Sequence, residues 1–203
     1  MSDSITLAMT GASGAIYGVR LLEQLLLAGK TVHFLLSTPA RLVIKMELSI
    51  SLPSRASDLK KQLVEKYSAK AEQLYVYGLE QWTAPVASGS AISRAMVICP
   101  CTSGTMASIA HGMSRNLIER AADVSLKERK QLILVHRETP LSPIHMQNML
   151  TLSQAGAIIL PASPAFYNQP QTIQDVTDTV VARILDHLNI EHQLLPRWGE
   201  NAQ

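Results

Sequence analysis

The stretch Thr10-Gly-Ala-Ser-Gly-Ala-Ile-Tyr-Gly18 separates a short apolar run from a segment with helical spacing. The apolar run, residues 5–9, has the length and composition of a buried strand. The segment that follows, residues 15–28, places apolar side chains three and four positions apart, and Gly29 stands where a helix C-cap would. A strand, a turn of small residues and a helix in this order predict one β-α unit.

The same alternation continues along the chain and predicts an α/β fold, a doubly wound parallel sheet with helices on both faces. The length of 203 residues fits a single domain, residues 1–203, of which residues 189–203 show no period and are expected to form a C-terminal tail. The further strands are predicted at residues 32–36, 95–101, 132–136 and 157–160, and the clearest further helices at residues 57–72 and about 173–188.

Composition and charge argue against several classes of protein. The net charge of +2, without a Lys/Arg-rich run, does not indicate a nucleic-acid partner. No apolar stretch has the length needed to cross a membrane, and the first residues lack the features of a signal peptide. Cys99 and Cys101 flank Pro100, a spacing that matches neither zinc nor redox motifs, so both are expected to be reduced at the end of a buried strand. These features predict a cytoplasmic protein with no membrane partner and no metal.

The small-residue turn after the first strand is a candidate anion site. Ligands of parallel sheets bind beyond the carboxyl ends of the strands, where backbone N–H groups at a helix start favour an anion. The dinucleotide fingerprint needs Gly-x-Gly-x-x-Gly, whereas the glycines here stand at positions 11, 14 and 18, and Ser37 stands where an acidic residue would bind a ribose. FMN therefore fits better than NAD. The alternative is a turn whose glycines only permit helix–sheet packing.

Three later segments carry polar residues, and each has a functional and a structural interpretation. Thr102-Ser103-Gly104-Thr105 can form a second polar nest or merely cap a helix. Arg137 and Glu138 can supply a phosphate clamp and a proton carrier, or form a solvated pair. Arg120 and Lys127 are seven residues apart and share a helix face, which alone is more often a solvated face.

Tyr167 lies in the proline-rich segment of residues 161–170. Prolines at both ends and in the middle stiffen this segment, so that it could present the aromatic ring to a pocket. The alternative is a surface loop with one buried aromatic side chain.

Taken together, four stretches in this order resemble the UbiX-like flavin prenyltransferases: TGASGAIYG at residues 10–18, RAADVSLKER at 120–129, RETP at 137–140 and PAFY at 164–167. The resemblance extends from about residue 6 to residue 198. It implies a flavodoxin-like, metal-free enzyme that joins a five-carbon unit from dimethylallyl monophosphate to N5 and C6 of reduced FMN. It also implies a homododecamer with sites where subunits meet, whose prenylated FMN serves UbiD-like decarboxylases.

The resemblance also implies roles for individual residues, each read at the matching position of this chain. Glu47 and Glu138 would move protons, Arg120 would be a basic residue at the site, and Ser13 and Trp198 would lie near the chemistry. Lys127, Tyr167 and Arg183 would hold the prenyl phosphate. The implied contacts of FMN are Ala12, Ser13, Gly14, Ser37, Thr102, Ser103, Gly104, Thr105 and Arg137, and at Gly104 many relatives carry Lys instead.

Three rival functions remain at this point. An NAD-dependent reductase disagrees with the glycine spacing and with the absent acidic residue. An FMN-dependent decarboxylase of the peptidyl-cysteine class would carry Pro-Ala-Ser-Ala-Asn-Thr, from which the segment beginning at Pro161 departs. A non-catalytic FMN carrier would keep the flavin loops but would not need Glu47, Lys127 and Glu138.

Overall fold

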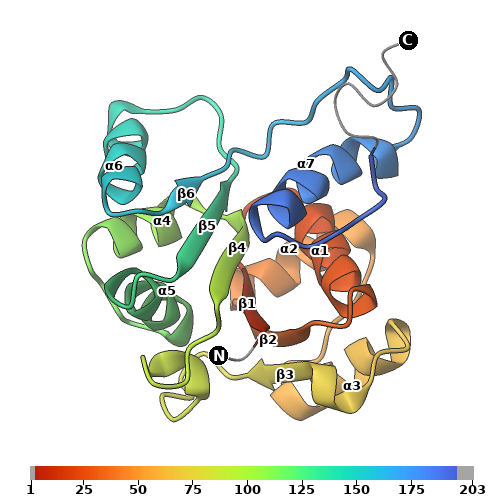
Figure 1. Ribbon diagram of the computed structural model, residues 1–203, viewed down its shortest axis with the longest axis horizontal. Helices are drawn as coiled ribbons and strands as arrows, with labels where there is room; N and C mark the ends of the chain where they lie inside the picture. Colours follow the sequence, from red (N-terminus) through yellow and green to blue (C-terminus); the bar gives the residue numbers. More distant parts are fainter. Residues whose placement is uncertain (1–2, 196–203) are drawn as a thin grey trace.

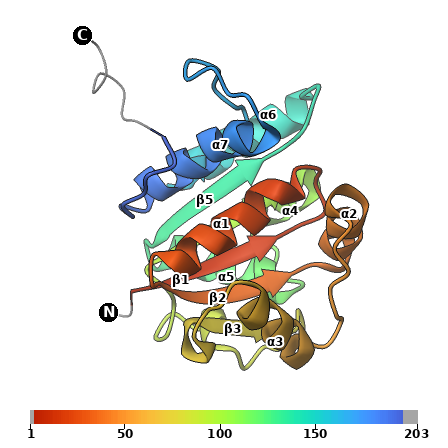
Figure 2. The same ribbon diagram turned by 90° about the vertical axis from the view of Figure 1, so that its right-hand side faces the viewer.

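A computed structural model of the protein describes residues 3–195 and shows a sheet of parallel strands between two layers of helices (Figures 1 and 2). The strand order is β3-β2-β1-β4-β5-β6, and every neighbouring pair is parallel. The strands are β1 Ser4–Met9, β2 Thr31–Leu36, β3 Leu74–Tyr77, β4 Ala95–Cys101, β5 Gln131–His136 and β6 Ile158–Ile159.

The helices bury one face each against the sheet. Alternate residues of the central strands point to opposite faces, so Ile5, Leu7 and Met9 of β1 enter one core and Ala8 enters the other. The first core is covered by α1 Ala15–Leu27, α2 Thr38–Leu48, α3 Ala56–Lys66 and α7 Ile173–His187, and the second by α4 Ser103–Ala110, α5 Leu117–Lys127 and α6 Pro143–Gln154.

The winding of the chain reverses between β1 and β4. From β1 the chain continues outward through β2 to β3, and it then returns to the other side of β1 and continues through β4 to β6. Loops on the two sides of such a switch point diverge at the carboxyl edge of the sheet and leave room for a ligand. The fold therefore places a crevice beside the ends of β1 and β4.

The five strands predicted from the sequence are confirmed, with boundary shifts of at most one residue. One further strand, β3, was not predicted, and the helix expected over residues 57–72 ends at Lys66. Helices α2 and α6 were also missing from the prediction. Residues 189–195 of the expected tail form no helix or strand, but Ile190 is buried in the first core and His192 Nε2 lies 3.1 Å from Asp186 Oδ1. Within residues 3–195, no helix is long and apolar enough to span a membrane.

Gly18 lets α1 approach the sheet closely. A Cβ atom there would lie 2.2 Å from the carbonyl oxygen of Cys99 and 2.6 Å from Met9 Cε, so backbone would have to move. We expect Gly18→Ala to lower the free energy of unfolding by about 1–3 kcal/mol, as overpacking does. Gly104→Ala is the matched control, because a Cβ there meets no atom within 4 Å and the alanine favours the helix. Urea unfolding of both variants measures the difference, and equal effects would contradict this account of Gly18.

Candidate active site

A hollow of about 320 Å³ opens at the carboxyl edge of the sheet, where β1, β2 and β4 end. It lies at the reversal of winding described above, so the fold itself provides this cavity. Its apolar wall includes Leu79 and Ile118. Its polar lining consists of Thr10, Ser37, Thr38, Thr102, Thr105 and Asn116.

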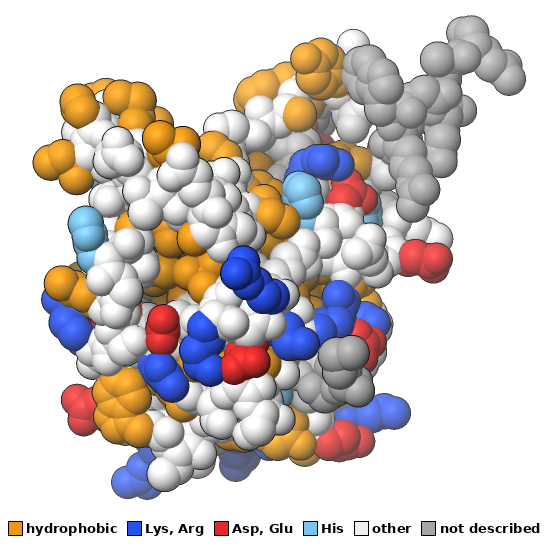
Figure 3. Space-filling model, turned by 60° about the vertical axis from the view of Figure 1, so that its left-hand side comes forward, with side chains coloured by type: hydrophobic (Ala, Val, Ile, Leu, Met, Phe, Trp, Pro, Cys, Tyr) orange, Lys and Arg blue, Asp and Glu red, His pale blue; other side chains and the backbone are white. Residues whose placement is uncertain are grey.

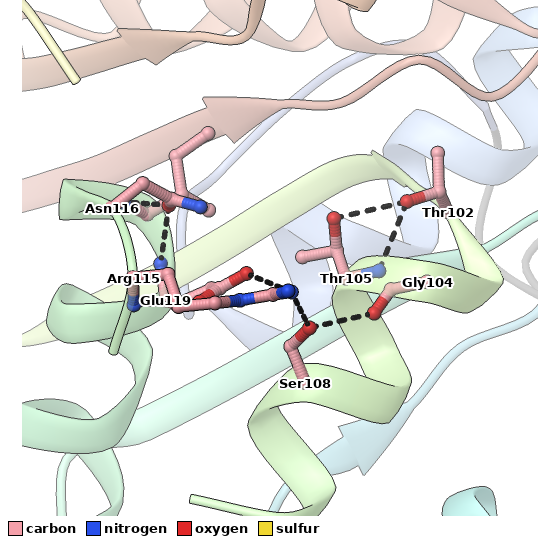
Figure 4. Close-up of polar contacts among 8 residues, drawn as sticks. Thr102, Gly104, Thr105, Ser108, Arg115, Asn116 and Glu119 are labelled. Carbon is pink, nitrogen blue, oxygen red and sulfur yellow. Dashed lines mark hydrogen bonds and ion pairs between the residues drawn. The ribbon is translucent and has the colours of Figure 1, made fainter. Parts of the chain in front are cut away.

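Three helices begin at this hollow, and each start is capped by a lining residue. Ser37 Oγ accepts from the Ala40 N–H at 3.1 Å at the start of α2. Thr102 Oγ1 accepts from the Thr105 N–H at 3.1 Å at the start of α4, and Asn116 Oδ1 accepts from two N–H groups at the start of α5 (Figure 4). Converging helix N-termini favour a bound anion, which suits a flavin phosphate.

An ion pair keeps the starts of α4 and α5 together. The Arg115 guanidinium donates to Glu119 Oε1 at 3.1 Å and to Ser108 Oγ at 2.6 Å, and Ser108 Oγ donates to the Gly104 carbonyl at 3.0 Å (Figure 4). Burial opposes ionisation of Glu119, but hydrogen bonds from Arg115 hold the pKa of this carboxyl below its ordinary value. The pair thus fixes Asn116 beside Thr102, and none of these contacts was predicted, because no sequence motif singled out Arg115 or Glu119.

The turn after β1 binds a carboxylate of the chain itself. Glu47, near the end of α2, accepts from the Gly14 N–H at 3.0 Å and from the Ala15 N–H at 2.8 Å. The anion site predicted at the start of α1 is therefore occupied by this side chain, and the polar hollow beside α2, α4 and α5 is the better place for a phosphate. The same contacts bring Glu47 to Ser13 and Ala12, two positions to which the resemblance assigns flavin contacts.

A second polar cluster lies at the ends of β4 and β5. Ser103 Oγ lies 2.9 Å from His136 Nε2 and 2.9 Å from Glu138 Oε2. The Ser103 hydroxyl, and then the Thr139 N–H, lower the pKa of Glu138 below its ordinary value. Burial lowers the pKa of His136, so this imidazole is neutral near pH 7. His136 was predicted only as the end of a strand, and its contact with Ser103 gave no sequence signal.

Arg120 and Lys127 lie elsewhere, on α5. The helix starts at the hollow and ends just before β5, so Lys127 is about 15 Å down the helix, near the amino edge of the sheet. Arg120 donates to the Ala87 carbonyl at 3.2 Å and pairs with Asp123, and Lys127 pairs with Glu128. Lys and Arg side chains interleaved with Asp and Glu are visible on the face shown in Figure 3. One chain therefore does not bring Lys127 to its own flavin loops, whereas Arg120 lies one turn from Asn116 at the hollow.

Tyr167 and Arg183 belong to a third region. The loop that carries Tyr167 is tied to α7 by the Ala165 N–H, which donates to Thr179 Oγ1 at 3.2 Å. Tyr167 is 80% exposed. Arg183 lies one turn further along α7, also exposed, and pairs with Asp186 at 2.7 Å. Trp198 lies outside the residues that the structure describes.

Neither the two cysteines nor any cluster of metal-binding side chains adds a reactive site to residues 3–195. Cys99 and Cys101 are buried free thiols, as predicted, and burial raises the pKa of Cys101 to about 12. A protonated thiol is a poor nucleophile. Among residues 3–195, no group of three or more His, Cys, Asp or Glu side chains is arranged to hold a metal ion.

Comparison with known proteins agrees with the fold and identifies the family. The Flavoprotein family model matches residues 2–185. The flavin prenyltransferase UbiX of Pseudomonas aeruginosa is 54% identical over 198 residues, which cover 98% of this chain and 95% of that protein.

Two solved structures have the same architecture over almost the whole chain. AnUbiX in complex with FMN and dimethylallyl pyrophosphate matches with a TM-score of 0.87 and 39% identity, covering 98% of each chain. A dodecameric FMN-dependent UbiX-like decarboxylase from Escherichia coli O157:H7 matches with a TM-score of 0.84 and 37% identity, covering 96% of this chain and 98% of that one. The protein therefore belongs to the UbiX family of flavin prenyltransferases.

Proposed function

We propose that the protein transfers a dimethylallyl group from dimethylallyl monophosphate to N5 and C6 of reduced FMN. The observation that carries the proposal is the hydroxyl-lined hollow at three helix starts, in a chain 54% identical to a named flavin prenyltransferase. The structure of the relative AnUbiX is a complex with FMN and dimethylallyl pyrophosphate, which supports FMN and a dimethylallyl donor as the substrates. The prenylated product would pass to a UbiD-like decarboxylase, and the protein would act in the cytoplasm.

The flavin phosphate is proposed to bind at the hollow, to Ser37, Thr102, Thr105 and the adjoining helix starts. Ser37 Oγ and Thr102 Oγ1 already cap helices, and the Thr102 hydroxyl donates to Thr105 Oγ1 at 2.9 Å. The Ser37 and Thr105 hydroxyls can still donate their hydrogens to a phosphate oxygen. The turn at Ala12, Ser13 and Gly14, together with Arg137, is proposed to contact the isoalloxazine ring. A Cβ atom at Gly104 would meet no atom within 4 Å, so the fold leaves space there for the Lys that the resemblance implies in many relatives.

The leaving phosphate is proposed to bind the cations that one chain holds away from its flavin loops. A phosphate monoester carries close to two negative charges at neutral pH, and ionisation of the allylic C–O bond requires that this charge be stabilised. Lys127, Arg183 and Arg120 supply positive charge, and Tyr167 supplies a π face and a hydroxyl. We propose that neighbouring subunits of a homo-oligomer, as in a dodecamer, combine these residues at one site, because a single chain places Lys127 about 15 Å along α5 from the hollow.

The carboxylates of Glu138 and Glu47 are proposed to transfer protons during the reaction. Formation of the C–C6 bond must end with loss of the C6 proton to a base, and Glu138 is an exposed carboxylate at the carboxyl edge of the sheet. Glu47 is held beside Ser13 and can exchange protons near N5. Trp198 is proposed to shield the allylic cation from water.

Two other functions predict different experimental results. A flavin carrier would bind FMN but leave it unmodified in the presence of the prenyl phosphate. A peptidyl-cysteine decarboxylase would consume a C-terminal cysteine peptide and release carbon dioxide, with FMN taking up the two electrons and gaining no prenyl group.

Thr105→Val is expected to weaken FMN binding roughly tenfold, because a hydrogen bond to a charged phosphate is lost while the side-chain shape is kept. Isothermal titration of the protein with FMN measures this effect. Thr151→Val is the matched control, since the Thr151 hydroxyl on α6 donates to the Gln147 carbonyl, away from the hollow. Absence of wild-type binding at tens of micromolar FMN, or equal losses in both variants, would contradict the proposed phosphate site.

A further inference from the structure

The cluster of Ser103, His136 and Glu138 has a hydrogen-bond direction that its chemistry determines. A serine hydroxyl has one hydrogen, and Ser103 donates it to the Glu138 carboxylate at 2.9 Å. The Ser103 oxygen must then accept at its 2.9 Å contact with His136, so His136 carries its proton on Nε2. The order of donation is therefore from imidazole to hydroxyl to carboxylate.

His136 is built to hold this tautomer. The residue is 2% exposed, and its backbone is fixed on both sides, since its N–H donates to the Leu160 carbonyl and its own carbonyl accepts from the Ala162 N–H. The ring packs edge-on against His145 of α6 at a centroid distance of 6.3 Å. A buried imidazole in this setting cannot rotate away from Ser103 without displacing the His145 ring, against which it packs.

The cluster is not a hydrolytic triad. In a Ser-His-acid triad the carboxylate contacts the imidazole, and the imidazole accepts the serine proton. Here the carboxylate contacts the serine hydroxyl itself, and the imidazole N–H donates to the same oxygen. His136 therefore does not act as a base toward Ser103, and the Ser103 hydroxyl serves to orient Glu138.

We propose that His136 is a positioning residue for the proton-transfer carboxylate. Its Nε2–H donates to Ser103 Oγ, so that the Ser103 hydroxyl donates to Glu138 and keeps this carboxylate ionised and oriented for proton transfer. The proposal rests on the proposed function, in which ionised Glu138 accepts the C6 proton. It also changes the role expected for Ser103, whose proton serves Glu138 rather than the flavin phosphate.

The titratable groups around the cluster allow a pH test. Glu138 faces His136 and His145. His136 faces Glu138 and His145, and the thiol-bearing Cys101 is its register partner on β4. Arg137 follows His136 in the sequence. The thiol stays protonated, because burial raises its pKa to about 12. Loss of the Ser103 donor removes the main cause of the lowered pKa of Glu138, so that pKa rises. Activity that needs ionised Glu138 is then lost at a higher pH as the solution is acidified.

The test uses Ser103→Ala, His136→Leu and His136→Gln in the whole protein. For each variant, the pH dependence of kcat for prenyl transfer and the affinity for FMN are measured. Isotope-edited infrared titration follows the Glu138 carboxylate, assigned by its loss in Glu138→Gln. For the first two variants we expect both the acidic limb of kcat and the infrared titration to move to higher pH. We also expect kcat on the acidic side to fall roughly tenfold, with FMN affinity within about twofold of wild type. His136→Gln keeps an N–H donor at a similar reach and is expected to restore the wild-type profile.

Unmoved titrations, or a Gln variant as impaired as the Leu variant, would overturn the proposal. Ser103→Ala keeps the proposal falsifiable if His136→Leu fails to fold. If the wild-type protein makes no prenylated FMN, the proposed function fails, whereas the infrared titration still decides whether His136 and Ser103 set the ionisation of Glu138.

Discussion

Glu138→Gln is expected to slow prenyl transfer by roughly 100-fold or more while leaving FMN affinity within about twofold of wild type. The amide keeps the size of the side chain and can still contact Ser103, but it cannot accept the C6 proton. A group that acts only in the chemical step changes kcat and not ground-state binding.

Anaerobic single-turnover assays with reduced FMN and dimethylallyl monophosphate measure the rate, and titration measures FMN affinity. Glu65→Gln on α3 is the control, because it makes the same change on an exposed helix. Equal losses of FMN affinity and turnover in Glu138→Gln would show a structural role for Glu138 instead.

Lys127→Ala and Arg183→Ala are each expected to weaken binding of dimethylallyl monophosphate by about 10- to 100-fold with little change in FMN affinity. The physical reason is the loss of a charge-assisted contact to a dianion. Lys61→Ala removes an exposed cation from α3 and is the control. Loss of FMN affinity with retained prenyl phosphate affinity would reverse the assignment of the two phosphates.

The placement of Lys127 also allows a mixing experiment. Lys127 and Glu138 lie near opposite edges of the sheet in one chain, so the proposed site combines residues of two subunits. Co-assembled Lys127→Ala and Glu138→Gln subunits are expected to regain part of the activity that each lacks, because some sites combine the intact residue of each. Mixtures no more active than the separate variants would contradict a shared site.

Sequence periodicity predicted the parts of the fold that are fully buried. The central strands are continuous apolar runs, and α1 and α7 repeat apolar residues at helical spacing. Strand β3 was missed because Leu-Tyr-Val-Tyr is short and lies at the sheet edge. Helix α2 was missed because Leu42 and Met46 are exposed, which blurs its apolar stripe.

The candidate site was predictable as a set of residues but not as an arrangement. The loops at the ends of β1, β2 and β4 follow from the rule for parallel sheets, and the structure places them around one hollow. The contact of Glu47 with the start of α1 spans more than 30 positions, and no local pattern encodes it. The same holds for the link between Ser103 and His136, which depends on the register of β4 against β5.

The mass of FMN after anaerobic incubation with the protein and dimethylallyl monophosphate tests the central claim most directly. The account predicts that reduced FMN gains the mass of one five-carbon prenyl unit, that phosphate is released in equal amount, and that the gain is strongly reduced with Glu138→Gln. FMN that binds to the protein but keeps its original mass, with the prenyl phosphate intact, would contradict the claim and indicate a flavin carrier.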